Sequence, residues 1–161
     1  MSEFEALRSE VCRVNRSLVE AGLVVLTWGN ASGADRTQGV MAIKPSGVPY
    51  ERLMPDDMIV IDLASGEIIE GKGRPSSDTP THLHLYRAFG AIGGVVHSHS
   101  DFATSFAQAG CEIPCMGTTH ADYFYGSIPC TQDMSPKEIV ENYELNTGRF
   151  RSLPVLNPNM T

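Results

Sequence analysis

The chain has 161 residues, 42% of them hydrophobic and 19% charged, so it can bury the core of a single domain. Its formal net charge of -7 argues against a nucleic-acid-binding protein, because phosphate contacts need clustered Lys and Arg, but a small pocket could still be locally positive. The 4 cysteines form no CxxC pair, and no run approaches the roughly 20 apolar residues of a membrane span, so we expect a cytoplasmic protein with reduced thiols and no membrane partner.

The first half of the chain is predicted to hold one helix and several strands. A helix is expected over residues 3–21, where apolar side chains recur every three or four positions, and Gly22 is placed to end it. The run LVVLTWGNASG at 23–33 predicts a buried strand that ends in a Gly/Asn/Ser loop. VMAIKPSGV at 40–48 predicts a second strand with a Pro-Ser-Gly turn, and DMIVIDLASGEIIEG at 57–71 predicts a hairpin that turns at Ser65-Gly66.

The second half alternates helices with strand and loop. A helix is predicted from DTPTHLHLYRAFG at 78–90, with Asp78 or Thr79 as its N-cap, and a strand from GGVVHSH at 93–99. A short helix is expected over 101–109, and loop with a short strand over 111–130. Ser135 and Glu138 have the spacing of a capping box and predict a further helix start, whereas the pattern fades after Gly148. These elements indicate a layered α/β domain whose sheet is not purely parallel.

His97 and His99 are candidates for a metal site. Alternate residues of a strand point to the same side, with Cα atoms about 6.5–7 Å apart, so two imidazoles at this spacing can converge on one ion. The alternative is a polar pair that merely ends a buried strand. His82 and His84 have the same spacing but lie in a predicted helix, where their side chains diverge, so at least one of them is expected to serve packing or the surface.

Three polar loops are candidates for an anion site. WGNASG, KPSG and RPSSD each adjoin a predicted strand or helix and offer small residues with free backbone N–H groups, and Lys44 could add a positive charge. The three loops could converge into a phosphate cradle, although each by itself could be an ordinary turn. None of them matches a Walker loop or a dinucleotide-binding fingerprint.

Two carboxylates have more than one interpretation. Asp78 could cap the following helix, or its carboxylate could face a metal or a substrate, and these roles are compatible. Asp122 lies between His120 and Tyr123, and in a partly apolar setting the pKa of its carboxyl would rise into the range useful for proton transfer. Equally, this segment could be a polar surface loop whose aromatic side chains pack inward.

Five segments taken together resemble a known family. TWGNASG, IKPSGV, PSSDTPTH, GGVVHSHS and GTTHADYFYG, in this order and spacing, closely resemble the class II aldolase/epimerase family and, within it, the L-ribulose-5-phosphate 4-epimerases. The resemblance runs from the first predicted helix to about Gly148. It implies a three-layer α/β/α domain with a central mixed, mainly antiparallel sheet, spanning residues 1–161 as one domain.

The resemblance also implies roles for particular residues. His97 and His99 match two zinc ligands, and Asp78 matches the acidic residue that belongs to the same metal site. Asp122 matches a catalytic acid/base that acts in a site shared between adjacent subunits of a homotetramer. The residues that match substrate and phosphate loops are Gly29, Asn30, Lys44, Ser46, Gly47, Ser76 and Ser77.

The implied reaction is epimerisation at C4 of L-ribulose 5-phosphate to D-xylulose 5-phosphate in the catabolism of L-arabinose or L-ascorbate. The implied cofactor is Zn²⁺, with Mn²⁺ or another divalent ion as alternatives, and the implied partner is a phosphorylated ketopentose. PSSDTPTH and THADYFYG favour the epimerase over the aldolase branch, in which the position of Asp78 is typically Glu. A class II aldolase acting on a sugar such as L-fuculose 1-phosphate, or an inactive relative, are the alternatives.

The end of the chain departs from the pattern of the family. The third zinc histidine of the family and its second acid/base, a tyrosine of the C-terminal tail, would both lie beyond position 161. The tail RFRSLPVLNPNMT resembles a shortened passage toward the strand that carries this histidine. The sequence therefore predicts a domain that is incomplete at its C-terminus.

Overall fold

A five-stranded sheet forms the centre of the computed structural model, which describes residues 3–124, 126–131 and 133–151. The strands follow the order β4-β3-β2-β1-β5, and every neighbouring pair is antiparallel. The sequence predicted a mixed, mainly antiparallel sheet, and the described residues hold only its antiparallel pairings. The strand bounds are β1 Asn30–Asp35, β2 Val40–Ile43, β3 Ile59–Asp62, β4 Ile68–Glu70 and β5 Gly94–His97.

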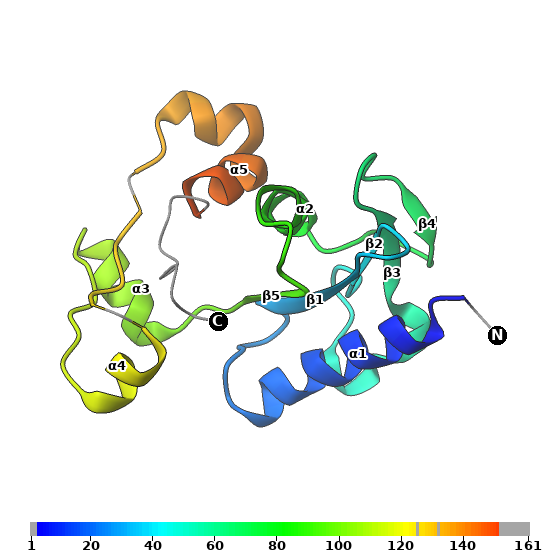
Figure 1. Ribbon diagram of the computed structural model, residues 1–161, viewed down its shortest axis with the longest axis horizontal. Helices are drawn as coiled ribbons and strands as arrows, with labels where there is room; N and C mark the ends of the chain where they lie inside the picture. The colour runs from blue at the N-terminus through cyan, green and yellow to red at the C-terminus, as the bar shows by residue number, and fades with distance from the viewer. Residues whose placement is uncertain (1–2, 125, 132, 152–161) are drawn as a thin grey trace.

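Helices cover both faces of the sheet (Figure 1). Helix α1 (Glu5–Glu20) lies on one face and α2 (Thr79–Ala88) on the other, and α5 (Pro136–Arg151) packs on α2. Helices α3 (Asp101–Gln108) and α4 (Thr118–Tyr123) follow β5 and lie to one side of the sheet, and two short 3-10 helices, Tyr50–Arg52 and Pro55–Asp57, precede β3. The predicted three-layer α/β/α architecture is confirmed.

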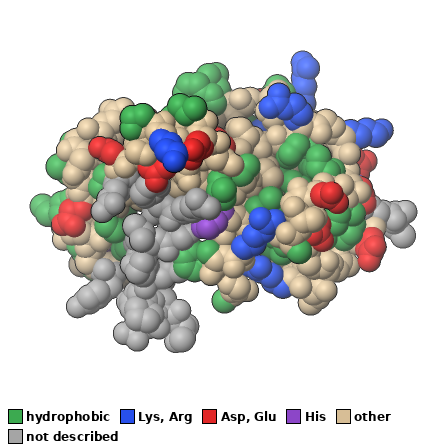
Figure 2. Space-filling view, turned by 90° about the horizontal axis from the view of Figure 1, so that it is seen from above, with side chains coloured by type: hydrophobic (Ala, Val, Ile, Leu, Met, Phe, Trp, Pro, Cys, Tyr) green, Lys and Arg blue, Asp and Glu red, His purple; other side chains and the backbone are tan. Residues whose placement is uncertain are grey.

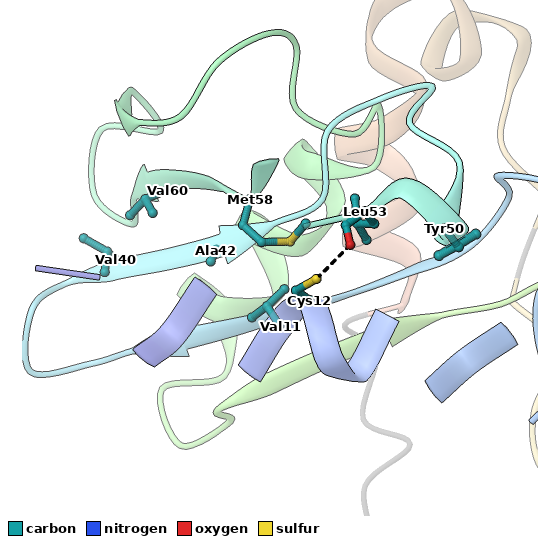
Figure 3. Close-up of a cluster of buried hydrophobic side chains, with 8 residues drawn as sticks. All are labelled: Val11, Cys12, Val40, Ala42, Tyr50, Leu53, Met58 and Val60. Atoms are coloured by element: carbon teal, nitrogen blue, oxygen red, sulfur yellow. Dashed lines mark hydrogen bonds between the residues drawn. The ribbon is translucent and has the colours of Figure 1, made fainter. Parts of the chain in front are cut away.

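The central strands β2 and β3 are buried on both faces because their side chains alternate between two cores. Val40, Ala42 and Val60 face α1, where they meet Val11 and Cys12 (Figure 3). The intervening strand residues face α2 and pack against it to form the second core. This core consists of Met41, Ile43, Ile59 and Ile61 from the strands, with Leu83 and Tyr86 from α2. Uninterrupted apolar runs in the sequence therefore correspond to strands that are covered by helices on both sides.

The ends of the helices agree with the predicted signals. Gly22 and Gly110 follow α1 and α3 with φ of 67° and 65°, the left-handed conformation that glycine adopts without strain. Before α5, the backbone N–H of Ser135 donates to Glu138 Oε2 at 2.8 Å, and the N–H of Glu138 donates to Ser135 Oγ at 3.3 Å. The predicted capping box is confirmed.

The prediction of a buried strand at residues 23–28 is wrong. Leu26 has a φ of 55°, and the Trp28 N–H donates to the Val25 carbonyl at 3.0 Å, so this segment turns instead of extending. Strand β1 is formed by the residues that were expected to be the loop. Their small side chains permit close contact with α1, because a Cβ on Gly33 would lie 3.0 Å from Val11 Cγ2. Packing against α1 thus overrides the low strand propensity of NASGAD.

The segment 111–130, predicted as loop and short strand, also contains a helix. Helix α4 spans Thr118–Tyr123, and the short strand pairing is reduced to one antiparallel bridge between Ile113 and Ile128. The part of the tail from 152 to 161 lies outside the described residues. Within the described ranges, no helix is both long and apolar enough to span a bilayer.

Candidate active site

The order of the strands brings the predicted site segments together at one end of the sheet. Strand β1 is antiparallel to both of its neighbours, so its first residues lie beside the last residues of β2 and β5, and Asn30 pairs directly with His97. Gly29 makes the closest approach there: its φ is 86°, and a Cβ at this position would lie 2.7 Å from the His97 carbonyl oxygen. Only glycine fits this contact without displacing the backbone of β5.

A polar cavity of about 450 Å³ opens where these segments meet. Its walls include residues of the three polar loops named in the sequence analysis, together with the end of β5. Figure 2 shows a histidine at the surface close to a group of Lys and Arg side chains. The predicted substrate-binding residues that line it are Gly29, Lys44, Ser46, Gly47, Ser76 and Ser77. Asp78, His97 and His99, the predicted metal-site residues, line the same cavity.

Asn30 supports the cavity from behind, with a relative exposure of 2%. Its amide nitrogen donates to Ser76 Oγ at 3.1 Å and to the Asp78 carboxylate, which ties the start of β1 to the loop before α2. Its Oδ1 atom is buried and accepts no hydrogen bond from the residues that the structure describes. A buried acceptor of this kind is costly unless a water or a ligand donates to it.

Lys44 places a buried amine at the cavity, with a relative exposure of 2%. Its Nζ donates to the Pro45 carbonyl at 3.2 Å and lies 5.0 Å from the centroid of the Tyr50 ring, a cation–π distance. Burial lowers the pKa of Lys44, and the charge of Asp78 opposes that effect only in part. A bound anion would compensate the cost of burying this charge.

His97, His99 and Asp78 form a contiguous group. The two imidazole centroids lie 4.7 Å apart, and His97 Nδ1 is 3.1 Å from Asp78 Oδ2. Burial alone would raise the pKa of Asp78, but the hydrogen bond and charge of His97, together with the Asn30 hydrogen bond and the His82 charge, lower it to about 2. Asp78 directly precedes α2, yet its carboxylate makes no capping hydrogen bond, so its side chain serves this group instead.

Two imidazoles of this group, those of His97 and His99, are available to ligate one divalent ion. Because Asp78 engages Nδ1 of His97, the Nε2 atom of this ring remains for an ion, and a carboxylate that orients a metal-binding imidazole is a recurrent arrangement. His99 offers the second imidazole. Over the described residues, no three His, Cys, Asp or Glu side chains are grouped closely enough to complete a site. The structure therefore provides two imidazoles and an orienting carboxylate.

Asp122 is not brought to this cavity within the chain. It lies on α4, is exposed, and belongs to the wall of neither cavity that reaches the histidines. Its helical neighbours Ala121 and Tyr123 are exposed as well, so the part of the chain that the structure describes does not give Asp122 the partly apolar surroundings predicted for it. Its role as an acid/base stays a prediction, and it requires a second subunit.

A second cavity of about 260 Å³ reaches the same histidines from the side of α2 and α5. It shares Asp78, His97 and His99 with the first cavity and adds Thr81, His82 and Glu144. Burial and the charge of Asp78 raise the pKa of Glu144, and the Thr81 hydrogen bond opposes this shift. No sequence pattern pointed to Glu144, which is one of several acidic residues on a polar helix.

A buried hydrogen-bonded network joins α2 to the sheet beside the second cavity. Ser32 Oγ on β1 lies 2.7 Å from His82 Nδ1 and 2.8 Å from the Tyr86 hydroxyl. His82 and Tyr86 are fully buried, so the expectation that one histidine of the THLH segment serves packing is met by His82. Burial raises the pKa of Tyr86, and the Ser32 hydroxyl, the Arg36 charge and the backbone of Val95, two residues before His97, oppose this shift.

Comparison with known proteins identifies the family to which this chain is similar. Residues 9–148 match the family described as Class II Aldolase and Adducin N-terminal domain. The chain is similar to an L-fuculose 1-phosphate aldolase, with 28% sequence identity and a TM-score of 0.74, over 88% of this chain and 66% of that one. It is similar to the L-fuculose-1-phosphate aldolase from Thermus thermophilus, with 27% identity and a TM-score of 0.67, over 89% and 69% of the two chains.

A sugar-phosphate aldolase from Thermotoga maritima shares the fold, with 17% identity and a TM-score of 0.66, over 94% of this chain and 78% of that one. Of the L-fuculose 1-phosphate aldolase with 28% identity, the chain spans 66% of the length, which is just under two thirds. The family match extends from within α1 into α5 and includes the strands and loops that form both cavities. The resemblance found in the sequence motifs is therefore confirmed at the level of the family: the chain belongs to the class II aldolase and adducin N-terminal domain family.

Proposed function

We propose that this chain carries the site of a divalent-metal-dependent enzyme that acts on sugar phosphates, and that its reaction is epimerisation at C4 of L-ribulose 5-phosphate. The observation that carries the proposal is the buried Lys44 amine in a cavity that also holds paired imidazoles, since such a cavity matches a ligand with a phosphate and a ketose. The PSSDTPTH and THADYFYG segments, which resemble the epimerase branch, support C4 epimerisation over aldol cleavage.

The phosphate is expected to bind where Lys44 meets the serines and glycines of the loops. Ser46 and Ser76 line the cavity with Gly47, whose φ of 73° turns the backbone after β2. The backbone N–H groups of Ser46 and Ser76 already donate to the carbonyls of Arg74 and Lys44, so the serine hydroxyls and the Lys44 amine are the donors expected to reach phosphate oxygens. This arrangement would hold the fragment of the sugar that bears the phosphate.

His97 and His99 are the residues that would hold the metal ion, with Asp78 fixing the orientation of His97. A bound divalent ion would supply Lewis acidity to the carbonyl and hydroxyl oxygens of the ketose. The unpartnered Oδ1 of Asn30, in the described part of the chain, is placed to accept a hydrogen bond from a ligand or a water at the same end of the sheet.

Inversion at C4 follows from cleavage and re-formation of the C3–C4 bond. A base removes the C4 hydroxyl proton as the bond breaks, which leaves an enediolate and glycolaldehyde phosphate. The aldehyde turns, the bond forms on its other face, and an acid returns a proton to O4. We assign one of these proton transfers to Asp122 of an adjacent subunit. The phosphate loops would keep the aldehyde from leaving between the two steps.

The proposal is tested by incubating the zinc- or manganese-loaded protein with L-ribulose 5-phosphate and following C4 by NMR. We expect D-xylulose 5-phosphate to form without free glycolaldehyde phosphate. In Lys44→Met, the KM should rise by about 100-fold, because the phosphate loses a charged donor. Lys72→Met, which changes an exposed lysine, is the matched control and should behave as wild type.

The second candidate is an aldolase, which the similarity to two fuculose-phosphate aldolases favours. Accumulation of free aldehyde without the epimer would support the aldolase and exclude the epimerase. A third outcome, in which the protein neither retains zinc or manganese nor is stabilised by either, would indicate a non-catalytic member of the family.

A further inference from the structure

The His97/His99 pair lies at the junction of two cavities that differ in chemistry. The cavity of about 450 Å³ carries Lys44 and several serines, whereas the cavity of about 260 Å³ carries Glu144 with Thr81 and a wall of aliphatic side chains. The Lys44 amine would attract a phosphate to the first cavity, and the Glu144 carboxylate would disfavour a phosphate in the second. A linear ligand with its phosphate beside Lys44 and its middle oxygens at the imidazoles would therefore extend its other end toward Glu144.

We propose that Glu144 binds the terminal C1 hydroxyl of a phosphorylated ketose and so determines which ketoses this site accepts. This inference rests on the proposed function, in which the phosphate sits at C5 and the reacting oxygens sit between the two ends. A carboxylate accepts hydrogen bonds from hydroxyl groups more strongly than a neutral acceptor does. No other described acidic side chain of the second cavity is open to a ligand in this way, because Asp78 is engaged by His97 and Asn30.

The carboxylate of Glu144 is held in place but retains capacity to accept. Thr81 Oγ1 lies 2.6 Å from the Glu144 carbonyl oxygen and 3.3 Å from its Oε2. A hydroxyl has one proton to donate, and the shorter contact favours the carbonyl. Among residues 3–124, 126–131 and 133–151, no further hydrogen bond is made to this carboxylate, so its oxygens can accept from a ligand.

The backbone of α5 directs Glu144 at the cavity through a kink. Asn142 has a φ of -167° and a ψ of 79°, which breaks the helix, and its Oδ1 accepts from the Leu145 N–H at 3.2 Å to restart it. Beyond the kink, Gly148 allows a close approach to α2, since a Cβ there would lie 3.1 Å from His84 Cβ. Glu144 lies between these two points, and so its position is set by the packing of α5 on α2.

The test combines a substitution in the protein with a deletion in the ligand. Dissociation constants of L-ribulose 5-phosphate and of its 1-deoxy analogue would be measured by calorimetry on metal-loaded wild type, Glu144→Ala and Glu141→Ala. Glu141 is the matched control, because it lies on the same helix, is exposed and pairs with Lys137 at 3.7 Å. We expect wild type and Glu141→Ala to bind the parent sugar about 10-fold more tightly than the 1-deoxy analogue, and Glu144→Ala to bind both alike.

Three results would overturn the inference. If wild type binds both sugars equally, or if Glu144→Ala discriminates between them as wild type does, Glu144 does not bind the C1 hydroxyl, while the proposed function stands. If wild type binds neither sugar, the proposed function fails together with the inference. Inorganic phosphate serves as a further probe: its affinity should be the same in wild type and Glu144→Ala, and an equal loss for phosphate and sugar would count against the inference, because the effect would then not be specific to the C1 hydroxyl.

Discussion

Asp78 holds together three side chains that come from different parts of the sequence. Its carboxylate accepts from the Asn30 amide and lies 3.1 Å from His97 Nδ1, and Ser76 Oγ lies 3.3 Å away. The contact with His97 fixes which ring nitrogen faces the carboxylate and leaves the other for an ion. The same position therefore controls the orientation of an imidazole without being required as a metal ligand itself.

Asp78→Asn should weaken metal binding without unfolding the protein. The amide keeps the size of the side chain but loses the charge that orients His97, so we expect the affinity for Zn²⁺ to fall by about 10- to 100-fold, measured by competition with a chelating dye. Asp101→Asn, an exposed acidic residue shortly after His99, is the control and should leave the affinity unchanged. An unchanged affinity in Asp78→Asn would show that this carboxylate has no part in the metal site.

At the scale of elements, the Ser32, His82 and Tyr86 network couples the position of α2 to the sheet. Asp78 lies one turn before His82, and His97 lies two residues after Val95, whose backbone influences the Tyr86 hydroxyl. The network thus fixes the two elements that carry the Asp78 and His97 contact. Because Ser32 bonds both partners, it is the member whose loss affects the most groups.

Ser32→Ala should therefore destabilise the protein more than Tyr86→Phe. The first change removes the contact of two fully buried polar groups and should lower the free energy of unfolding by about 2–3 kcal/mol, whereas the second removes one hydroxyl and should cost about 1–2 kcal/mol. Urea denaturation followed by circular dichroism measures both. Ser65→Ala, in the exposed β3–β4 turn, is the comparison and should cost less than either. Equal losses for Ser32→Ala and Tyr86→Phe would contradict the bridging role of Ser32.

How far the sequence predicts these elements depends on whether local or distant contacts decide them. Helices α1, α2, α3 and α5 and strands β2 to β5 follow from periodicity, caps and turns. Strand β1 could not be predicted, because NASGAD extends only by packing its small residues against α1. Gly29, Lys44 and Ser76 were found as loop residues, but that their loops meet depends on the strand order, which no single segment encodes. The position of Glu144 at the second cavity depends on the packing of α5 on α2, and no sequence pattern indicates this position.

At the scale of the whole molecule, exposed apolar side chains indicate surfaces that a partner subunit could cover. Phe102, Met116, Tyr123 and Val140 have relative exposures of 83%, 86%, 73% and 86%. Tyr123 adjoins Asp122 on α4, so an assembly that buries it would also carry Asp122 toward a neighbouring subunit. The predicted role of Asp122 therefore depends on the predicted assembly, because Asp122 can reach a cavity only in a neighbouring subunit.

Mixing two inactive variants tests this link. His97→Asn removes an imidazole from the cavity, and Asp122→Asn removes the proposed acid/base. If the two groups act across subunits, refolding both variants together should restore up to about a quarter of the wild-type rate of C4 epimerisation, because some shared sites then receive two intact residues. Each variant refolded alone is the control. A mixture as inactive as its components, or a wild-type protein that sediments as a monomer, would refute shared sites.

The contact between Gly29 and the His97 carbonyl has a consequence for selectivity. Because a Cβ at Gly29 would come within 2.7 Å of that oxygen, the loop before β1 and the end of β5 pack backbone against backbone, and no side chain fits between them. This contact holds the loop that borders the cavity beside the strand that carries the imidazoles through the main chain. If the proposed phosphate and metal positions are right, we expect a sugar phosphate with one carbon more or fewer between its phosphate and its carbonyl to bind less tightly.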